Sequence, residues 1–297
     1  MDYGRALQFG LFPTPVSDEV ETVLALVQAA EDGGLDLVGI QDHPYQRRFL
    51  DTWALMATVL ARTERIRVFP DVANLPLRPP AVMAKAAASL DVLSGGRFEL
   101  GLGAGAFWDA VAAMGGPRRS PGEAAAALEE AIEVIRAMWS DQRSVRYSGS
   151  HYQLSGVKPG PRPAHRMGIW LGVGGPRLLA TLGRVADGWV PSASWAPAER
   201  LGALHARIDD AAVSAGRDPA DIQRLYNLFG TITDGPSEGS LNGPPEQWVD
   251  ELTALALEYG MDTFIFGPAS PDVGQVRRFA GEVAPAVREA VARDRGR

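Results

Sequence analysis

Short apolar runs alternate with longer segments of helical periodicity along most of the chain. The apolar runs lie at residues 7–12, 35–40, 66–69, 98–102, 169–171, 188–190, 225–233 and 263–266. In the segments between them, apolar side chains recur at i, i+3, i+4 and i+7, as at Val20, Val23, Leu24 and Val27, which is the pattern of a helix with one buried face. The chain therefore reads as eight strand–helix units.

Eight such units favour a (β/α)8 TIM barrel, an α/β fold, over an open doubly wound sheet. The first four strands follow one another at about 30 residues, the spacing of a βα repeat. The spacing before the fifth strand is longer. Two strand-like pieces at 145–147 and 151–154 and a proline-rich connector at 158–163 predict a hairpin inserted over about 140–168. We expect one domain, 1–297.

In a barrel of this kind, ligands bind where the strands end, so the residues just after each apolar run are the candidates for chemistry. Small residues, aromatic rings and one histidine occupy these positions. The candidate site residues are Phe12, Asp42, His43, Val72, Ala73, Asn74, Gly103, Ala104, Gly105, Phe107, Trp108, Val173, Gly174, Gly175 and Arg177.

His43 is the candidate acid–base group. The chain has four histidines, and only His43 directly follows a predicted strand. Its imidazole could exchange a proton near neutral pH, and Asp42 could orient the loop or raise the pKa of His43. The alternative is that His43 only hydrogen-bonds the backbone before Pro44. No histidines are paired at metal-ligand spacing, so we expect no metal site.

Two glycine clusters differ in what they can hold. Residues 172–175 read Gly-Val-Gly-Gly and lead through Pro176 and Arg177 into a helix, a place where free N–H groups attract a phosphate. The alternative is a plain strand–helix turn. The run at 101–105 lacks the G-x-G-x-x-G spacing, but in a barrel it leaves room for a flat ring, with Phe107 and Trp108 as walls.

Composition narrows the function classes. The chain has no cysteine, which excludes disulfide scaffolds, Cys-ligated metals and thiolate nucleophiles. A net charge of −7 without a basic run predicts no nucleic-acid partner. Apolar stretches long enough to span a membrane are absent, and the N-terminal residues lack a signal-peptide pattern, so we expect a cytoplasmic protein without membrane contact.

An ordered set of motifs resembles the bacterial luciferase-like flavin-dependent oxidoreductases over almost the whole chain. The motifs are the run at 29–36, the Asp42–His43 pair, the segment 80–85 leading into 93–103, and the segment 169–175 followed by 186–189. The resemblance implies a flavin or deazaflavin over the strand ends, a homodimer, and a separate enzyme that reduces the cofactor.

The resemblance also assigns roles within the site. A non-proline cis peptide would form a bulge behind the ring, and the matching bond here is Val72–Ala73. His43 matches the histidine near the reactive edge of the ring, and the phosphate would rest on Gly174 and Gly175. A small organic substrate would bind beside the ring.

The resemblance leaves FMN and coenzyme F420, both in the reduced form, as the two cofactor candidates. The Asp42–His43 pair is similar to the F420-using branch, whereas FMN monooxygenases more often show Glu-His. The glutamate that sugar-phosphate dehydrogenases place after the fourth-strand glycines is missing, because Gly105 is followed by Ala106, Phe107 and Trp108. This departure argues against their chemistry and favours an apolar substrate.

Two other functions are alternatives to a flavin-dependent oxidoreductase. A barrel that binds flavin without turnover, for storage or sensing, stays open. An aldolase needs a lysine on a barrel strand or a metal, and the chain offers only Lys85 and Lys158, one in a predicted helix and one in the insertion.

Overall fold

Eight parallel strand positions close into a barrel, as the sequence predicts. The computed structural model describes residues 2–296. The strands around the barrel pair in the order β3-β2-β1-β12-β10-β9-β8-β5-β4, and Val68 bridges to Phe98 across the remaining gap. They are β1 (Gln8–Leu11), β2 (Leu37–Ile40), β3 (Arg67–Pro70), β4 (Ala73–Asn74), β5 (Leu100–Gly103), β8 (Ile169–Leu171), β9 (Gly188–Trp189), β10 (Gln223–Ile232) and β12 (Thr263–Pro268), and a short β11 (Asn242–Gly243) also pairs with β10.

The third strand is split into β3 and β4 by a bulge. Pairing with β2 ends at Pro70, and pairing with β5 begins at Ala73. The two residues between them carry the cis peptide, which joins Asp71 to Val72. The prediction of Val72–Ala73 was therefore wrong by one bond, because Ala73 already belongs to the next run of ladder hydrogen bonds.

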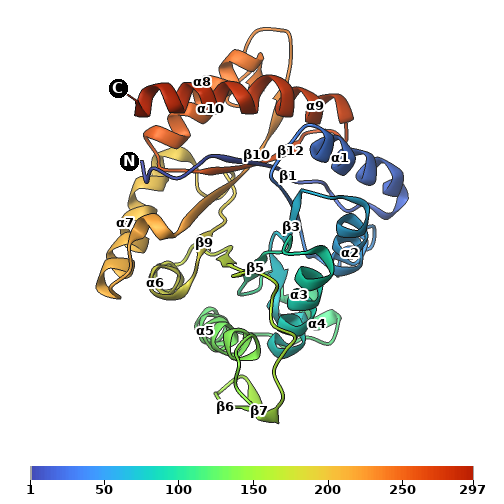
Figure 1. Ribbon diagram of the computed structural model, residues 1–297, viewed down its shortest axis with the longest axis vertical. Helices are drawn as coiled ribbons and strands as arrows, with labels where there is room; N and C mark the ends of the chain where they lie inside the picture. The colour runs from blue at the N-terminus through green and yellow to red at the C-terminus, as the bar shows by residue number, and fades with distance from the viewer. Residues whose placement is uncertain (1, 297) are drawn as a thin grey trace.

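Helices surround the barrel (Figure 1), with α8, α9 and α10 lying together beside β10 and β12. The short helix α4, which follows β5, was not predicted. The helices are α1 (Val20–Asp32), α2 (Thr52–Arg62), α3 (Pro80–Ser94), α4 (Trp108–Ala113), α5 (Pro121–Met138), α6 (Pro176–Val185), α7 (Ala198–Ser214), α8 (Pro245–Leu257), α9 (Val273–Arg278) and α10 (Ala284–Arg295), with single turns η1 (Ser17–Glu19), η2 (Leu75–Leu77) and η3 (Pro219–Asp221) and a π-helical turn η4 (Phe279–Val283).

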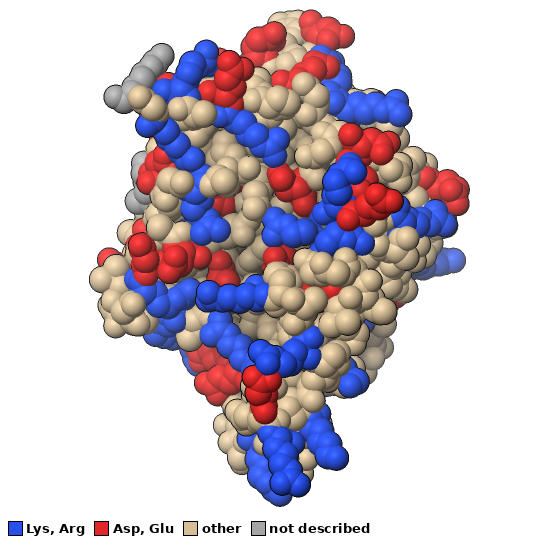
Figure 2. Space-filling model, viewed as in Figure 1, with Lys and Arg blue, Asp and Glu red and all other residues tan. Residues whose placement is uncertain are grey.

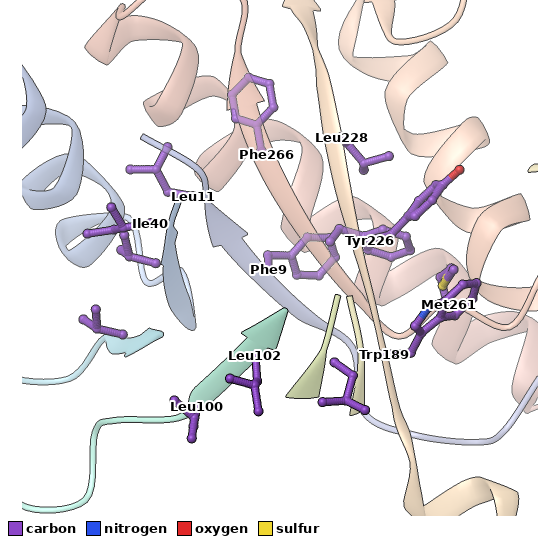
Figure 3. Packing of buried hydrophobic residues seen from close by; sticks show 14 of the residues in the cluster. Phe9, Leu11, Ile40, Leu100, Leu102, Trp189, Tyr226, Leu228, Met261 and Phe266 are labelled. Atoms are coloured by element: carbon purple, nitrogen blue, oxygen red, sulfur yellow. The ribbon is translucent and has the colours of Figure 1, made fainter. Parts of the chain in front are cut away.

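The main core lies between the strands and the helices (Figure 3). Phe9 and Leu11 of β1, Leu102 of β5 and Tyr226 of β10 are buried there. On β12, Phe266 stacks on Phe279 of η4 with ring centroids 4.6 Å apart. Burying one large apolar side chain stabilises the folded state by about 1.5–3 kcal/mol. This layer therefore holds in place the strands that position the site.

The inside of the barrel is layered, and β10 passes through every layer. Its inward-facing residues are Gln223, Leu225, Asn227 and Phe229, at the period of two that a strand imposes. Leu225 belongs to an apolar middle layer, as expected for a packed barrel interior. The middle layer consists of Leu37, Phe69, Val72, Trp170, Val190, Leu225 and Ile265, with Phe12 at its edge.

The layer at the amino ends of the strands is polar and closes the barrel floor. Gln8 accepts hydrogen bonds at its side-chain oxygen from Arg67 (2.8 Å) and from Gln223 (2.7 Å). Arg67 also donates to Glu99 over 3.1 Å. Since these groups satisfy one another, the polar floor does not need a ligand.

The predicted insertion is an antiparallel hairpin, β6 (Val145–Ser148) with β7 (Gln153–Val157). It projects at one end of the molecule beside α5 (Figure 1). Glu130 of α5 accepts hydrogen bonds from the backbone N–H groups of Ser150, His151 and Tyr152. The hairpin is therefore attached to the outside of a helix.

Residues 2–296 lack the features of a membrane span and of a metal cluster. None of the helices there is both long enough and apolar enough to cross a bilayer. The same residues contain no group of three or more His, Asp or Glu side chains that could hold a metal ion.

Candidate functional site

A cleft opens at the carboxyl ends of the strands. Its larger part has a volume of about 600 Å³, and an adjoining part has about 260 Å³. The two parts share His43, Val72, Gly172, Val173 and Gly174 in their walls. The cleft therefore extends over the barrel mouth from the end of β2 to the end of β8.

Most of the candidate residues line this cleft. Phe12 lines the larger part, and the smaller part is lined by Asp42, His43, Val72, Ala73, Asn74, Gly103, Ala104, Gly105, Val173 and Gly174. Gly175, Arg177, Phe107 and Trp108 are not among the lining residues. The roles of all these residues in binding or catalysis stay predictions.

His43 lies at the rim, where the turn after β2 places it. The N–H of Gln46 donates to the His43 carbonyl over 2.9 Å, with Pro44 at the second position of the turn, which its fixed φ favours. Burial lowers the pKa of His43, and the negative charge of Asp42 only partly opposes this. The net direction is opposite to the rise that Asp42 alone would cause, so His43 is neutral at pH 7.

Asp42 is buried and its carboxylate is fully engaged. Arg78 donates to both of its oxygens, at 2.8 and 3.0 Å. The backbone N–H of Asn74 donates to Oδ2 over 3.0 Å. Asp42 therefore joins the end of β2 to β4 and does not hydrogen-bond His43, which makes it a positioning residue.

Asp71 and Asn227 form a polar pair at the bottom of the cleft, just above the apolar layer. The side-chain amide of Asn227 donates to Asp71 Oδ1 over 3.1 Å. Asp71 Oδ2 and Asn227 Oδ1 are buried and have no hydrogen-bond partner within residues 2–296. Burial raises the pKa of Asp71 to about 7, because the charged form has lost its water.

The glycines of the cleft are required by their neighbours. A Cβ added at Gly103 or Gly172 would lie 2.8 or 2.9 Å from a methyl group of Val72. At Gly174 it would lie 2.0 Å from the ring of Trp195. Gly175 caps α6, and no side chain caps the first N–H groups of that helix, so they are free to bind an anion.

Arg177, in the first turn of α6, is already paired. It donates to both carboxylate oxygens of Glu129, at 3.2 and 2.5 Å. Glu129 also accepts a hydrogen bond from Thr181 over 2.7 Å. The edge of the Arg177 guanidinium that faces Glu129 is therefore not available to a phosphate.

Aromatic side chains form the rim. Phe229 packs edge-on against Phe12, with centroids 5.3 Å apart. Phe107 packs edge-on against His43 at 5.7 Å and is 64% exposed. Its φ of 53° lies in the left-handed region, which is uncommon for a residue other than glycine.

The lining residues that were not identified from the sequence include Tyr45, Asp71, Trp195, Asn227 and Phe229. Two of them carried a readable signal. Asp71 directly follows the third apolar run, and Asn227 is a polar residue within the apolar run of β10. Nothing local marks Trp195, which reaches the cleft from the loop after β9.

Comparison with protein families gives a match to the luciferase-like monooxygenase model over residues 1–239. The chain belongs to the luciferase-like monooxygenase family. This confirms the resemblance noted in its sequence.

The curated relatives of this family member include F420-dependent enzymes. The F420-dependent glucose-6-phosphate dehydrogenase of Amycolatopsis mediterranei is 31% identical over 205 residues, 67% of this chain and 61% of the relative. The F420-dependent hydroxymycolic acid dehydrogenase of Mycobacterium tuberculosis is 32% identical over 224 residues, 72% of this chain and 60% of the relative. The matches thus span less than two thirds of the relatives' own length.

Solved structures agree on the fold. An F420-dependent secondary alcohol dehydrogenase in complex with an F420-acetone adduct superimposes with a TM-score of 0.85 at 21% identity, covering 95% of this chain and 99% of the other. The F420-dependent tetrahydromethanopterin reductase of Methanopyrus kandleri gives a TM-score of 0.81 at 19% identity, covering 95% of this chain and 99% of the other.

Proposed function

We propose that this luciferase-like protein is an oxidoreductase that binds reduced coenzyme F420 over the barrel mouth and acts on a small apolar substrate. The observation that carries the proposal is the combination of groups in one cleft. A neutral His43 lies at its rim, glycines form its wall, and unpartnered oxygens lie at its bottom.

The residues of the cleft fit a flat nitrogen heterocycle. Asp71 Oδ2, Asn74 Oδ1 and Asn227 Oδ1 are buried without a partner in the described chain, and leaving such atoms unpaired is costly. N–H and O–H groups of a bound ring system would pair with them. The missing Cβ atoms at Gly103 and Gly172 leave the Val72 side chain as the surface against which a ring can lie.

A cofactor phosphate would bind at the beginning of α6. The first N–H groups of this ten-residue helix have no side-chain cap, and the helix dipole favours an anion there. Gly174 and Gly175 let a ligand approach the backbone closely.

The bound cofactor would supply hydride chemistry, and the chain would supply position and proton handling. His43 would exchange a proton with the substrate at the cleft. Asp42 and Arg78 would hold the ends of β2 and β4 in register. Phe107, Trp195 and Phe229 would exclude water from the reacting groups.

The rim favours an apolar substrate over a sugar phosphate. Phe12, Phe229 and Trp195 line the larger part of the cleft. The glutamate that sugar-phosphate dehydrogenases place after the fourth-strand glycines is missing from this chain, and the carboxylates lining the cleft are Asp42 and Asp71. Small apolar alcohols and ketones are therefore the first substrates to test.

The test is a binding titration followed by turnover. We expect the purified protein to bind F420 more tightly than FMN and to interconvert an apolar alcohol and its ketone. His43→Gln should lower kcat by about 100-fold or more, the usual share of a positioned acid–base group, with little change in F420 affinity. His151→Gln, on the hairpin, is the matched control and should leave kcat unchanged.

Two outcomes would contradict this proposal. Tighter binding of FMN with substrate-dependent oxygen uptake would make the protein an FMN monooxygenase. Binding of either cofactor without turnover of any substrate would make it a storage or sensing barrel.

A further inference from the structure

Tyr45 lies two residues beyond His43 and folds back onto it. The turn from His43 to Gln46 brings the Tyr45 hydroxyl oxygen to 2.7 Å from His43 Nδ1, with the two ring centroids 5.5 Å apart. Tyr45 is partly buried and lines the cleft together with His43. This hydrogen bond is the only one from either side chain to residues 2–296.

The direction of this hydrogen bond follows from the two groups. Burial, reinforced by the charge of Asp42, raises the pKa of Tyr45 to about 12, so its hydroxyl keeps its proton. Burial lowers the pKa of His43, so its ring is neutral and has one nitrogen lone pair to offer. The tyrosine hydroxyl, having no other acceptor in the described chain, donates to Nδ1.

The carboxylate of Asp42 does not compete with Tyr45 for the hydrogen bond to His43 Nδ1. In many sites a carboxylate accepts the Nδ1–H of a histidine and leaves Nε2 as a proton acceptor. Here both oxygens of Asp42 are taken by Arg78 and by the N–H of Asn74. The neighbour that orients the His43 ring is instead the Tyr45 hydroxyl. Because this hydroxyl donates to Nδ1, it selects the tautomer with the proton on Nε2.

We propose that Tyr45 is a positioning residue that holds His43 as the neutral Nε2–H tautomer, so that the histidine offers a hydrogen-bond donor to the cleft. The substrate class that fits a donor is one with a carbonyl oxygen or an anionic oxygen at the reacting position. This consequence rests on the proposed function, whereas the tautomer itself does not.

Phe107 supports the same arrangement. Its ring contacts His43 at 5.7 Å and Tyr45 at 5.9 Å between centroids. An apolar ring against both partners keeps water from competing for their hydrogen bond. The left-handed backbone of Phe107 is the conformation in which its side chain reaches this position.

The experiment is nitrogen NMR on the cofactor-free protein. Long-range ¹H–¹⁵N correlation spectra of the ¹⁵N-histidine-labelled full chain, recorded above pH 7, report which ring nitrogen carries the proton. The chain has four histidines, and the spectrum of His43→Gln assigns the signals of His43. We expect wild-type His43 to show protonated Nε2 and unprotonated, hydrogen-bonded Nδ1.

Two variants complete the test. In Tyr45→Phe, loss of one hydrogen bond should lower the Nε2–H to Nδ1–H ratio by roughly five- to tenfold. In the wild type the hydroxyl of Tyr147, on the hairpin, donates to Glu133 of α5. Tyr147→Phe should therefore leave the ratio unchanged. A wild-type spectrum with protonated Nδ1, or a Tyr45→Phe spectrum like that of wild type, would overturn the proposal. If Tyr45→Phe does not fold, the wild-type spectrum alone decides.

Failure here and failure of the proposed function are distinguishable. The NMR result needs no cofactor or substrate, so the tautomer can be confirmed in a protein that does not bind F420. Conversely, an F420-dependent enzyme in which His43 carries its proton on Nδ1 would refute the role of Tyr45 and leave the proposed function in place.

Discussion

At the scale of single residues, the site depends on groups whose protonation is set by burial. Asp71 is 8% exposed, and its carboxyl group accepts a hydrogen bond from Asn227. It fits above the apolar layer because Gly39 faces it, and a Cβ there would lie 2.8 Å from Asp71 Oδ2. The carboxyl group is therefore held at the bottom of the cleft with little exposure to solvent.

This burial makes stability depend on pH. The pKa of Asp71 is about 7 in the folded protein and near 3.8 in an exposed chain. Between these values the folded protein keeps a proton that the unfolded chain has lost, so stability falls as pH rises from about 4 to 7. Asp71→Asn should remove this component and gain about 1–3 kcal/mol relative to wild type between pH 5 and pH 8.

Urea unfolding of both proteins at several pH values measures the effect. Asp262, whose pKa is also raised by burial, to about 6, contributes equally to both proteins. The difference between them therefore isolates Asp71. Parallel stability curves for the two proteins would show that Asp71 does not titrate in this range.

At the scale of elements, one arginine joins three pieces of the barrel mouth. Arg78 follows η2 and binds Asp42 at the end of β2. It also donates over 2.7 Å to Asp51, whose carboxylate caps α2 by accepting the N–H groups of Trp53 and Ala54. The loops that hold His43 and Asn74 are thereby connected.

Removing the Arg78 side chain should lower the free energy of unfolding. Arg78→Ala leaves the buried carboxylate of Asp42 unpaired, and breaking a buried pair in this way costs about 3–5 kcal/mol. Because Arg78 is partly exposed to solvent, we expect a loss of about 2–4 kcal/mol in urea unfolding. Arg48→Ala is the control, since its pair with Asp18 is exposed on both sides and such pairs contribute about 0–1 kcal/mol. Equal losses in the two variants would contradict the connecting role.

Elements were easier to predict than their contacts. Each of the eight apolar runs is a barrel strand, because the local hydrophobic pattern indicates both strand formation and burial. The cis bond was placed one residue late, since where pairing stops depends on β2 and β5, far away in sequence. The unpaired oxygens of Asp71 and Asn227 could not be foreseen, because 156 positions separate the partners.

At the scale of the whole molecule, the surface mixes charges of both signs (Figure 2). The net charge of −7 is thus spread, and the face in view shows acidic and basic side chains side by side. On α3 several apolar side chains are exposed, among them Val82 and Leu93, which are 65% and 84% exposed. Such exposed apolar side chains are common at protein–protein interfaces.

We expect the protein to be a homodimer in solution, as its family resemblance implies. Light scattering after size exclusion should then give twice the chain mass of 31.7 kDa. Leu93→Glu, which adds a charge to the exposed face of α3, should shift the mass toward that of one chain. A single-chain mass for wild type would refute the dimer.

The interior layering limits how far the cleft can reach along the barrel axis. Phe69 and Trp170 stand edge-on, with centroids 5.0 Å apart, beneath the cleft. Trp170 also lines a separate polar hollow of about 310 Å³ at the opposite end, beside Arg5 and Gln223. Both rings belong to the apolar layer that lies between the cleft and that hollow. Reach along the barrel axis is thus limited by this layer, independently of the residues that set the width of the mouth.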